Sequence, residues 1–237
     1  MSKQRDETGS QPLLDDERLE QSCVVANNRM NRERNALGTN GYEVELGFDP
    51  IQFLIERHQT NGTASWLDLC CGRGRALIEA GAVIRSAGRA SGTRITGIDL
   101  VDMFDAVPDD LAIVDLKVAS LHDWNTENQF DLITCVHGLH YIGDKLGLIT
   151  RASMWARAEG VFYANLDLAN LRSVTGQEFA TAFADAGMSY DPQKHLLQFR
   201  RDELKQTSRI FSWQYLGAND QAGPNYTGQE AVCSVYR

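Results

Sequence analysis

Short runs of β-branched and apolar residues recur along the chain up to about residue 167, and a polar or helical segment follows each run. Strands that alternate with helices in this way are typical of a parallel sheet with helices on its faces. The pattern therefore predicts an α/β fold. Its strands are expected at residues 65–70, 94–100, 116–120, 131–137 and 160–167.

Helix start and stop signals lie outside these strands. Asp49 followed by Pro50 is typical of an N-cap and a first helical position. Helical spacing of apolar residues predicts further helices after the first and the fourth strand. The spacing from Thr175 to Glu178 is that of a capping box, and Gly187 is expected to end the helix that follows in a left-handed conformation.

Beyond residue 187 the helical signals become sparse. Residues 194–200, 209–216 and 231–236 have strand character, and residues 218–225 are rich in turn formers. We therefore expect the sheet to end in antiparallel strands at its C-terminal side.

A glycine-rich turn follows the first strand, at residues 68–75. A helix that begins at such a turn brings its positive end to the carboxyl edge of the sheet, where open α/β sheets bind ligands. Gly72 and Gly74 lack a Cβ, so a ligand can approach the backbone closely. Asp99 ends the second strand, and a carboxylate there can accept hydrogen bonds from both hydroxyls of a ribose. The two features together predict a nucleoside site.

The type of nucleoside follows from the spacing within the turn. The third glycine of the dinucleotide pattern is absent, and an acid at Asp68 would repel a pyrophosphate but attract a sulfonium or an ammonium. The turn resembles the first motif of class I methyltransferases, acid-x-Gly-x-Gly-x-Gly, through Asp68, Cys70, Gly72 and Gly74. Cys70 stands where the family has its first glycine.

The resemblance extends from about residue 49 to residue 167, and it implies a Rossmann-like, doubly wound, mostly parallel sheet that binds S-adenosylmethionine and releases S-adenosylhomocysteine. Asp68 looks like the acid near the amino acid moiety of the cofactor, and Asp99, with Leu100 after it, like the ribose site. Ser120 and Leu121 are similar to the adenine-binding loop of the family. Residues 130–141 look like its fourth motif, which faces both cofactor and substrate.

His137 and His140 lie in that fourth segment and are the candidate catalytic residues, because an imidazole can deprotonate an acceptor near neutral pH. The alternative is that one of the two packs beside the cofactor, with His137 also a candidate cofactor contact, and that the other caps or fills the loop. Tyr141, Tyr42 and Asn165 are candidate acceptor contacts. Asn165, with Asp167, could equally well only terminate the fifth strand.

Methyl transfer from a sulfonium mainly requires alignment of the nucleophile and exclusion of water. We therefore expect transfer to an O or N atom of a small molecule, such as a natural product or specialised metabolite, without a metal ion. The alternatives are a methyltransferase that acts on a peptide or protein, a nicotinamide enzyme, and a nucleoside-binding module without catalysis.

The charge and composition of the chain restrict the classes of partner that it is expected to bind. The formal net charge is −9 and the basic residues are dispersed, which disfavours nucleic acid as a partner. No apolar run has the length of a membrane span, and no secretory signal precedes the first strand. The five cysteines have no zinc-site spacing and are typical of reduced cytoplasmic thiols. The oligomeric state stays open, with a homodimer as one alternative.

The expected organisation is a solvated, mobile leader at residues 1–22 and a single domain at 23–237. Within the domain we expect a helical lid segment at 23–48, the cofactor-binding core at 49–187 and the C-terminal antiparallel strands at 188–237. Residues 27–48 are too polar to be core, although Met30, Tyr42, Leu46 and Phe48 could cover the cofactor. The alternative is a segment draped on the surface.

Overall fold

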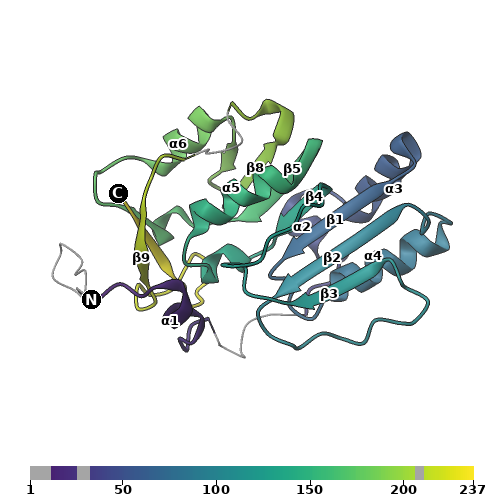
Figure 1. Ribbon diagram of the computed structural model, residues 1–237, viewed down its shortest axis with the longest axis horizontal. Coiled ribbons are helices and arrows are strands. Elements are labelled where there is room, and N and C mark those ends of the chain that lie inside the picture. The colour runs from purple at the N-terminus through teal and green to yellow at the C-terminus, as the bar shows by residue number, and fades with distance from the viewer. Residues whose placement is uncertain (1–11, 26–32, 206–210) are drawn as a thin grey trace.

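The computed structural model of the chain describes residues 12–25, 33–205 and 211–237. Its main feature is a seven-stranded sheet of order β3-β2-β1-β4-β5-β8-β7 (Figure 1). The first five strands in this order are parallel, and β8 and β7 are antiparallel to their neighbours. The strands are β1 Ala64–Leu69, β2 Thr93–Asp99, β3 Val114–Val118, β4 Phe130–Cys135, β5 Ala156–Asn165, β7 Ser189–Asp191 and β8 Leu196–Arg200.

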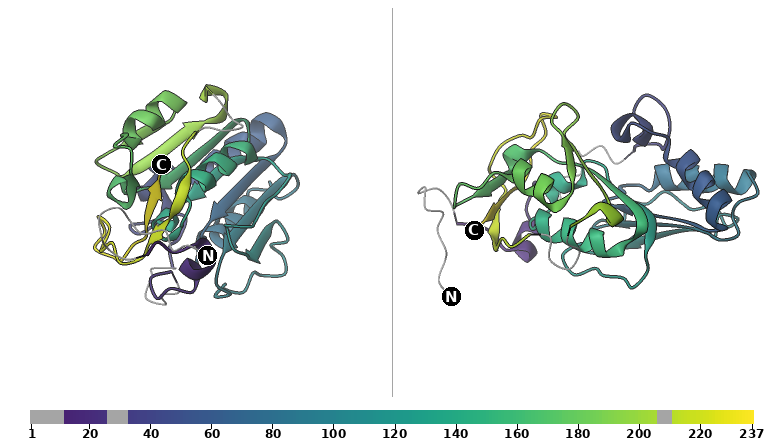
Figure 2. Two further views of the ribbon diagram at one scale, coloured as in Figure 1. Left: turned by 60° about the vertical axis from the view of Figure 1, so that its left-hand side comes forward. Right: turned by 90° about the horizontal axis from the view of Figure 1, so that it is seen from above.

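Helices cover both faces of this sheet, as the views of Figures 1 and 2 show. Side chains of β1 alternate between two core clusters: Trp66 packs in one, and Leu67 and Leu69 pack in the other. The first cluster takes in α2, α3 and α4, and the second takes in α5 and α6. The helices are α1 Asp16–Glu20, α2 Tyr42–Leu46, α3 Pro50–Asn61, α4 Arg75–Ser86, α5 Lys145–Trp155 and α6 Phe179–Ala186.

The predicted Rossmann-like, mostly parallel sheet is confirmed, and each of the five expected parallel strands overlaps a strand of the structure. The chain leaves β1 in one direction to form β2 and β3, and in the other to form β4 and β5. This change of direction is the topological switch point at which open α/β sheets bind ligands. The carboxyl ends of β1, β2 and β4 therefore define where a site is expected.

The predicted end of the sheet is right only in part. β7 and β8 extend it antiparallel, but β10 Cys233–Tyr236 lies in a second sheet, between β6 Leu171–Ser173 and β9 Tyr215–Asn219. β9 includes the first residues of the predicted 218–225 loop, because Ala218 pairs with both Ser234 and Leu14. The predicted 209–216 strand begins outside the described residues and otherwise overlaps β9 only at its end.

Two helix signals were read correctly and one was wrong. The Asp49 carboxylate accepts hydrogen bonds from Ile51 N and Gln52 N, and Gly187 ends α6 at φ +86°. The capping box before α6 does not form, because Glu178 is the N-cap and makes no side-chain cap. The Thr175 hydroxyl instead lies 2.9 Å from the Ser173 hydroxyl, at the end of β6.

The N-terminal expectations need correction. Residues 12–22 are not a solvated leader: Leu14 pairs with Ala218, and Leu19 of α1 is 1% exposed. The segment before α3 does contribute to the core, since Tyr42 and Leu46 are buried in the cluster around Trp66. Residues 1–11 and Met30 lie outside the described residues. Among the described residues, no helix combines the length and apolar character that a membrane crossing needs.

Candidate cofactor and acceptor site

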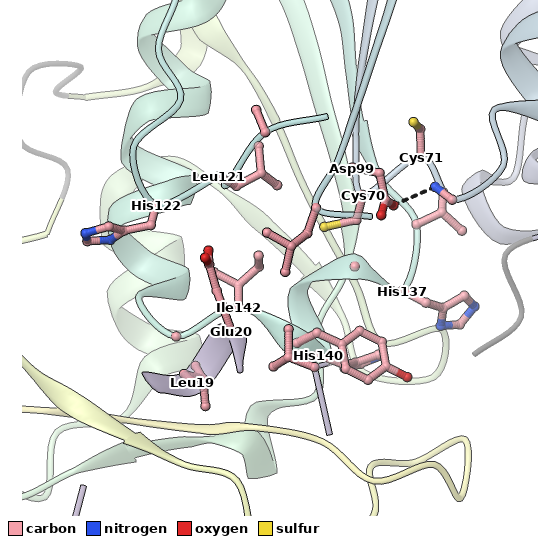
Figure 3. A pocket seen from close by; sticks show the side chains of 18 of the residues that line it. Leu19, Glu20, Cys70, Cys71, Asp99, Leu121, His122, His137, His140 and Ile142 are labelled. Carbon is pink, nitrogen blue, oxygen red and sulfur yellow. Dashed lines mark hydrogen bonds between the residues drawn. The ribbon is translucent and has the colours of Figure 1, made fainter. Parts of the chain in front are cut away.

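A cavity of about 230 Å³ opens at the carboxyl ends of β1, β2 and β4 (Figure 3). Its other walls come from α1, from the loop after β3, from residues 138–144, and from Thr227 and Gln229 near the C-terminus. The structure brings nine of the predicted site residues to this cavity: Tyr42, Cys70, Gly72, Asp99, Leu100, Leu121, His137, His140 and Tyr141. Four others are not part of its lining: Asp68, Gly74, Ser120 and Asn165.

The turn after β1 runs through three left-handed residues. Cys70, Gly72 and Gly74 have φ values of 61°, 59° and 75°, and Gly74 is the N-cap of α4. Cys70 takes the left-handed conformation although it has a side chain, an arrangement that is uncommon outside glycine. Gly138 makes room for it, because a Cβ at position 138 would lie 2.5 Å from the Cys70 Cβ.

Asp99 fixes the turn to the end of β2. Its carboxylate accepts hydrogen bonds from Gly72 N at 2.8 Å and from Val101 N at 3.1 Å; the first is the dashed line in Figure 3. Cys71 N donates to Ile98 O at 3.0 Å, so β2 holds two successive amides of the turn. An acid positioned in this way faces the cavity in the place expected for a ribose ligand.

Asp68 lies below the turn and not at the cavity wall, which corrects the expected placement of this acid. It is fully buried and accepts hydrogen bonds from Tyr42 Oη at 2.8 Å and from Thr134 Oγ1 at 2.5 Å. Burial raises the pKa of Asp68 to about 7, although both hydrogen bonds act to lower it. Through these bonds Asp68 joins α2 and β4 beneath the cavity floor. Tyr42, expected to contact the acceptor, thus directs its hydroxyl to Asp68.

The loop after β3 forms the end of the cavity nearest α1. Leu121 is buried and lines the cavity, whereas the Ser120 hydroxyl donates a hydrogen bond to Glu20 of α1. His122 Nδ1 lies 2.7 Å from Asp16 Oδ2. The predicted adenine-binding loop is therefore covered by a helix that the sequence interpretation assigned to a mobile leader.

The two candidate catalytic histidines differ strongly in environment. His137 has φ 57°, its Nε2 lies 3.0 Å from Glu45 Oε1, and its amide donates to Asn165 Oδ1 at 3.2 Å. His140 is 1% exposed, and neither ring nitrogen has a hydrogen-bond partner among the described residues. Burial, together with the charge of His137, lowers the pKa of His140 to about 3. His140 is therefore neutral at physiological pH and a weak base.

The remaining predicted residues have structural partners. Tyr141 Oη donates to Gln229 Oε1 at 2.9 Å and so closes the cavity against the C-terminal loop. The Asp167 carboxylate accepts from Ala169 N and Tyr226 N, which is a role in ending β5 and anchoring the loop. Asn165 is 1% exposed, and its side-chain oxygen accepts the hydrogen bond from His137 N.

Apart from Tyr42, sequence reasoning missed the cavity residues that come from outside the five parallel strands and the loops after them. These residues share no local motif, because only the tertiary fold brings them to the site. The Asp15 N-cap before Leu19 was the single usable signal for α1. The missed lining residues include Leu19, Glu20, Arg34, Ile142, Arg151, Thr227 and Gln229.

Comparison with known proteins agrees with this architecture. A family model described as a methyltransferase domain matches residues 36–215, which is more than half of the chain. The chain therefore belongs to the methyltransferase-domain family. No curated protein matches it in sequence.

Several solved structures are similar in fold at low identity. Coclaurine N-methyltransferase, bound to N-methylheliamine and SAH, matches with a TM-score of 0.40 and 19% identity over 54% of this chain and 36% of that chain. The plantazolicin methyltransferase BpumL, in complex with a pentazolic analogue and SAH, matches with a TM-score of 0.40 and 12% identity over 76% of this chain and 59% of that chain. SAM-bound CalS10, an amino pentose methyltransferase from Micromonospora echinaspora, matches with a TM-score of 0.37 and 18% identity over 54% of this chain and 57% of that chain. The chain thus spans roughly a third to three fifths of the length of these structures.

Proposed function

We propose that the chain transfers a methyl group from S-adenosylmethionine to an O or N atom of a small molecule, of the natural-product or specialised-metabolite kind. One observation carries the proposal: a single cavity joins the acid at the end of β2 to the imidazoles at the end of β4, across the left-handed turn after β1. Membership of the methyltransferase-domain family supports it.

The residues of the cavity fit this cofactor. Asp99, held by Gly72 N and Val101 N, provides a carboxylate for ribose hydroxyls, and Leu121 provides an apolar wall beyond it. Gly138 packs closely against Cys70 because it lacks a Cβ, and both residues line the cavity. Asp68, buried behind the turn, adds negative potential near the position of a sulfonium when it is deprotonated. Bound there, the cofactor supplies an electrophilic methyl group.

The chain's own contribution is to orient the acceptor and exclude water. His137, directed by Glu45 and by the Asn165 side chain, is the candidate base for an acceptor proton. His140 is better suited to bind than to take a proton: a neutral imidazole offers one donor and one acceptor to a polar group of the acceptor. Its two unpartnered nitrogens are consistent with that role.

A small acceptor is favoured over a peptide because two hydrogen bonds attach the C-terminal loop to the cavity wall. The Tyr141–Gln229 hydrogen bond and the Val232 N to His140 O bond hold the C-terminal loop against residues 138–141. An extended peptide would require this contact to open.

Calorimetry with S-adenosylhomocysteine and NADH tests the cofactor. We expect saturable binding of the former only, and saturable binding of NADH alone would refute the assignment. The acceptor is tested by incubating the chain with methyl-labelled S-adenosylmethionine and size-fractionated cell extract. Label is expected in the small-molecule fraction, and label confined to macromolecules would favour the peptide or protein alternative.

A further inference from the structure

Glu20 is one of two acidic side chains, with Asp16, that α1 contributes to the cavity beside the loop after β3. In Figure 3 it lies next to Ile142 and below Leu121, away from His137. It lines the cavity with Leu19, Leu121 and Ile142, and it accepts a hydrogen bond from Ser120 Oγ. This end of the cavity therefore combines apolar walls with carboxylates, of which Glu20 lies beside Leu121 and Ile142 while Asp16 and Asp144 also belong to the lining.

The position of Glu20 is set by tertiary contacts on several sides of α1. Leu19 is buried in a cluster with Ala218 and Val232. Asp16 accepts a hydrogen bond from Tyr215 Oη at 3.0 Å and lies 2.7 Å from His122 Nδ1. These contacts hold the carboxylate in place before a ligand binds, which reduces the ordering cost of binding.

The other polar side chains at this end have other partners. Asp16 accepts from Tyr215 Oη, and Asp144 accepts from Gly147 N and Tyr236 Oη. Arg151 donates to Leu121 O and to His122 O at 2.8 Å, and His122 faces Asp16. Glu20 thus presents an acceptor, since an ionised carboxylate has about four acceptor positions and one Ser120 bond uses one of them. A flat base bound between the apolar side chains would be recognised by whether its edge donates a hydrogen bond to this carboxylate.

We infer that Glu20 accepts a hydrogen bond from the exocyclic amino group of adenine and thereby selects adenine over a 6-oxopurine; the inference rests on the proposed function. Adenine carries a donor at this position, whereas hypoxanthine carries a carbonyl oxygen that the carboxylate repels. A site built to pair with one hydrogen-bonding group rejects an analogue that lacks it, because the buried polar group is left unpaired. Glu20 is in this view a specificity determinant supplied by the N-terminal helix.

The test uses calorimetry of the full chain with two probes, S-adenosylhomocysteine and its hypoxanthine analogue S-inosylhomocysteine. The measured quantity is the ratio of the two dissociation constants. For the wild-type chain we expect at least about a tenfold preference for the adenine ligand, the size of one charge-assisted hydrogen bond. Glu20→Gln, which keeps the shape of the side chain and can donate to an oxo group, is expected to bring the ratio close to one.

Glu20→Ala should weaken S-adenosylhomocysteine binding by about tenfold and also remove the preference. Glu17→Gln on the same helix is the matched control, since Glu17 is exposed and is not part of the cavity lining; it should keep the wild-type ratio. If both Glu20 variants keep the wild-type preference, the role of Glu20 is wrong while the proposed function stands. If the wild-type chain binds neither probe, both proposals fail.

Discussion

Asp99 connects the glycine turn to the cofactor in the proposed site, because its carboxylate holds Gly72 N and Val101 N while it faces the cavity. Asp99→Asn keeps an oxygen for only one of these two amides, which bond to different carboxylate oxygens, and it loses the charge to which a ribose hydroxyl would donate. We expect calorimetry to give an affinity for S-adenosylhomocysteine that is about 10- to 100-fold weaker. Asp102→Asn, three residues further and exposed, should bind as the wild type does. Equal affinities of the two variants would remove Asp99 from the site.

A second prediction concerns the effect of His140 on the pH dependence of stability. Burial lowers its pKa to about 3, so the folded protein keeps it neutral while the unfolded chain binds a proton below about pH 6.5. The unfolded state is therefore favoured as the pH falls from about 6.5 towards 3, by up to about 1.4 kcal/mol per pH unit. His140→Phe removes this proton uptake, and it should make the stability of the protein less sensitive to acid.

Urea unfolding of both proteins at pH 8, 6 and 5 measures the effect as a difference. At pH 8 the imidazole is neutral in both states, which provides the internal control. Asp68, whose raised pKa acts in the opposite direction, is present in both proteins and cancels. The wild type should lose stability relative to the variant between pH 6 and pH 5. A constant difference over all three values would show that His140 titrates normally in the folded state.

At the scale of elements, α1 depends on its tertiary contacts. It has five residues, too few for an isolated helix to be stable in water. Its one buried residue, Leu19, packs against the second sheet. Leu19→Ala should therefore release α1 locally, with tryptic cleavage after Arg18 about 10- to 30-fold faster because local opening costs less. The thermal midpoint should change little, while the affinity for S-adenosylhomocysteine falls.

Mass spectrometry of timed digests identifies the cut after Arg18, and Glu17→Ala provides a control on the exposed side of the same helix. Cleavage of Leu19→Ala at the wild-type rate would mean that α1 is held by its polar contacts alone. Addition of S-adenosylhomocysteine should slow cleavage of the wild type, because Leu19 and Glu20 line the cavity.

The elements that sequence predicted correctly are those with a local physical cause. The Asp49 cap and the Gly187 stop act within a few residues, and the glycine turn requires left-handed backbone that Gly72 and Gly74 supply without strain. The capping box failed because residues 173–175 are bound to β10: Val174 N donates to Tyr236 O. Pairing in the second sheet decided that segment, and no local pattern encodes it.

The same distinction explains which parts of the site could be predicted. Asp99, Leu121 and His137 follow parallel strands, so their meeting at one sheet edge follows from the topology. Glu20 and Gln229 reach the cavity from opposite ends of the chain, through the second sheet. Asp68 was identified as an acid of the turn, but its burial under Tyr42 could not be derived from spacing.

At the scale of the whole molecule, Lys145 joins the two sheets. It is fully buried at the start of α5, and its ammonium donates to Ile142 O at 2.9 Å, Val232 O at 2.7 Å and Ser234 Oγ at 2.9 Å. Ile142 belongs to the cavity wall, and Ser234 belongs to β10. Lys145 therefore links the second sheet to the cavity wall, alongside the hydrogen bonds from Ser234 Oγ to Gly143 O and from Tyr236 Oη to Asp144. Cavity shape and global stability thus depend on each other.

The methionine side chain in Lys145→Met is similar in length to lysine, but three buried acceptors lose their donor. Since each unsatisfied group costs about 1–3 kcal/mol and the loss of a buried charge offsets part of this, we expect a net destabilisation of about 2–4 kcal/mol. For a chain of this size the thermal midpoint should fall by about 5–15 °C. Lys117→Met provides the control: Lys117 is half exposed and forms a surface ion pair with Asp115, so its loss should cost at most about 0.5 kcal/mol.

Binding separates the two consequences of Lys145→Met. Measured well below its melting temperature, the folded variant should still bind S-adenosylhomocysteine more weakly than Lys117→Met, because Ile142 of the cavity wall has lost its link through Lys145 to Ser234 of β10. A variant that is destabilised but binds with wild-type affinity would show that the remaining bonds of Gly143 and Asp144 to β10 hold the wall without Lys145. Wild-type stability would instead show that the three acceptors find other donors, and that the two sheets are joined mainly by the apolar contacts of Tyr236 with Phe179 and Trp213.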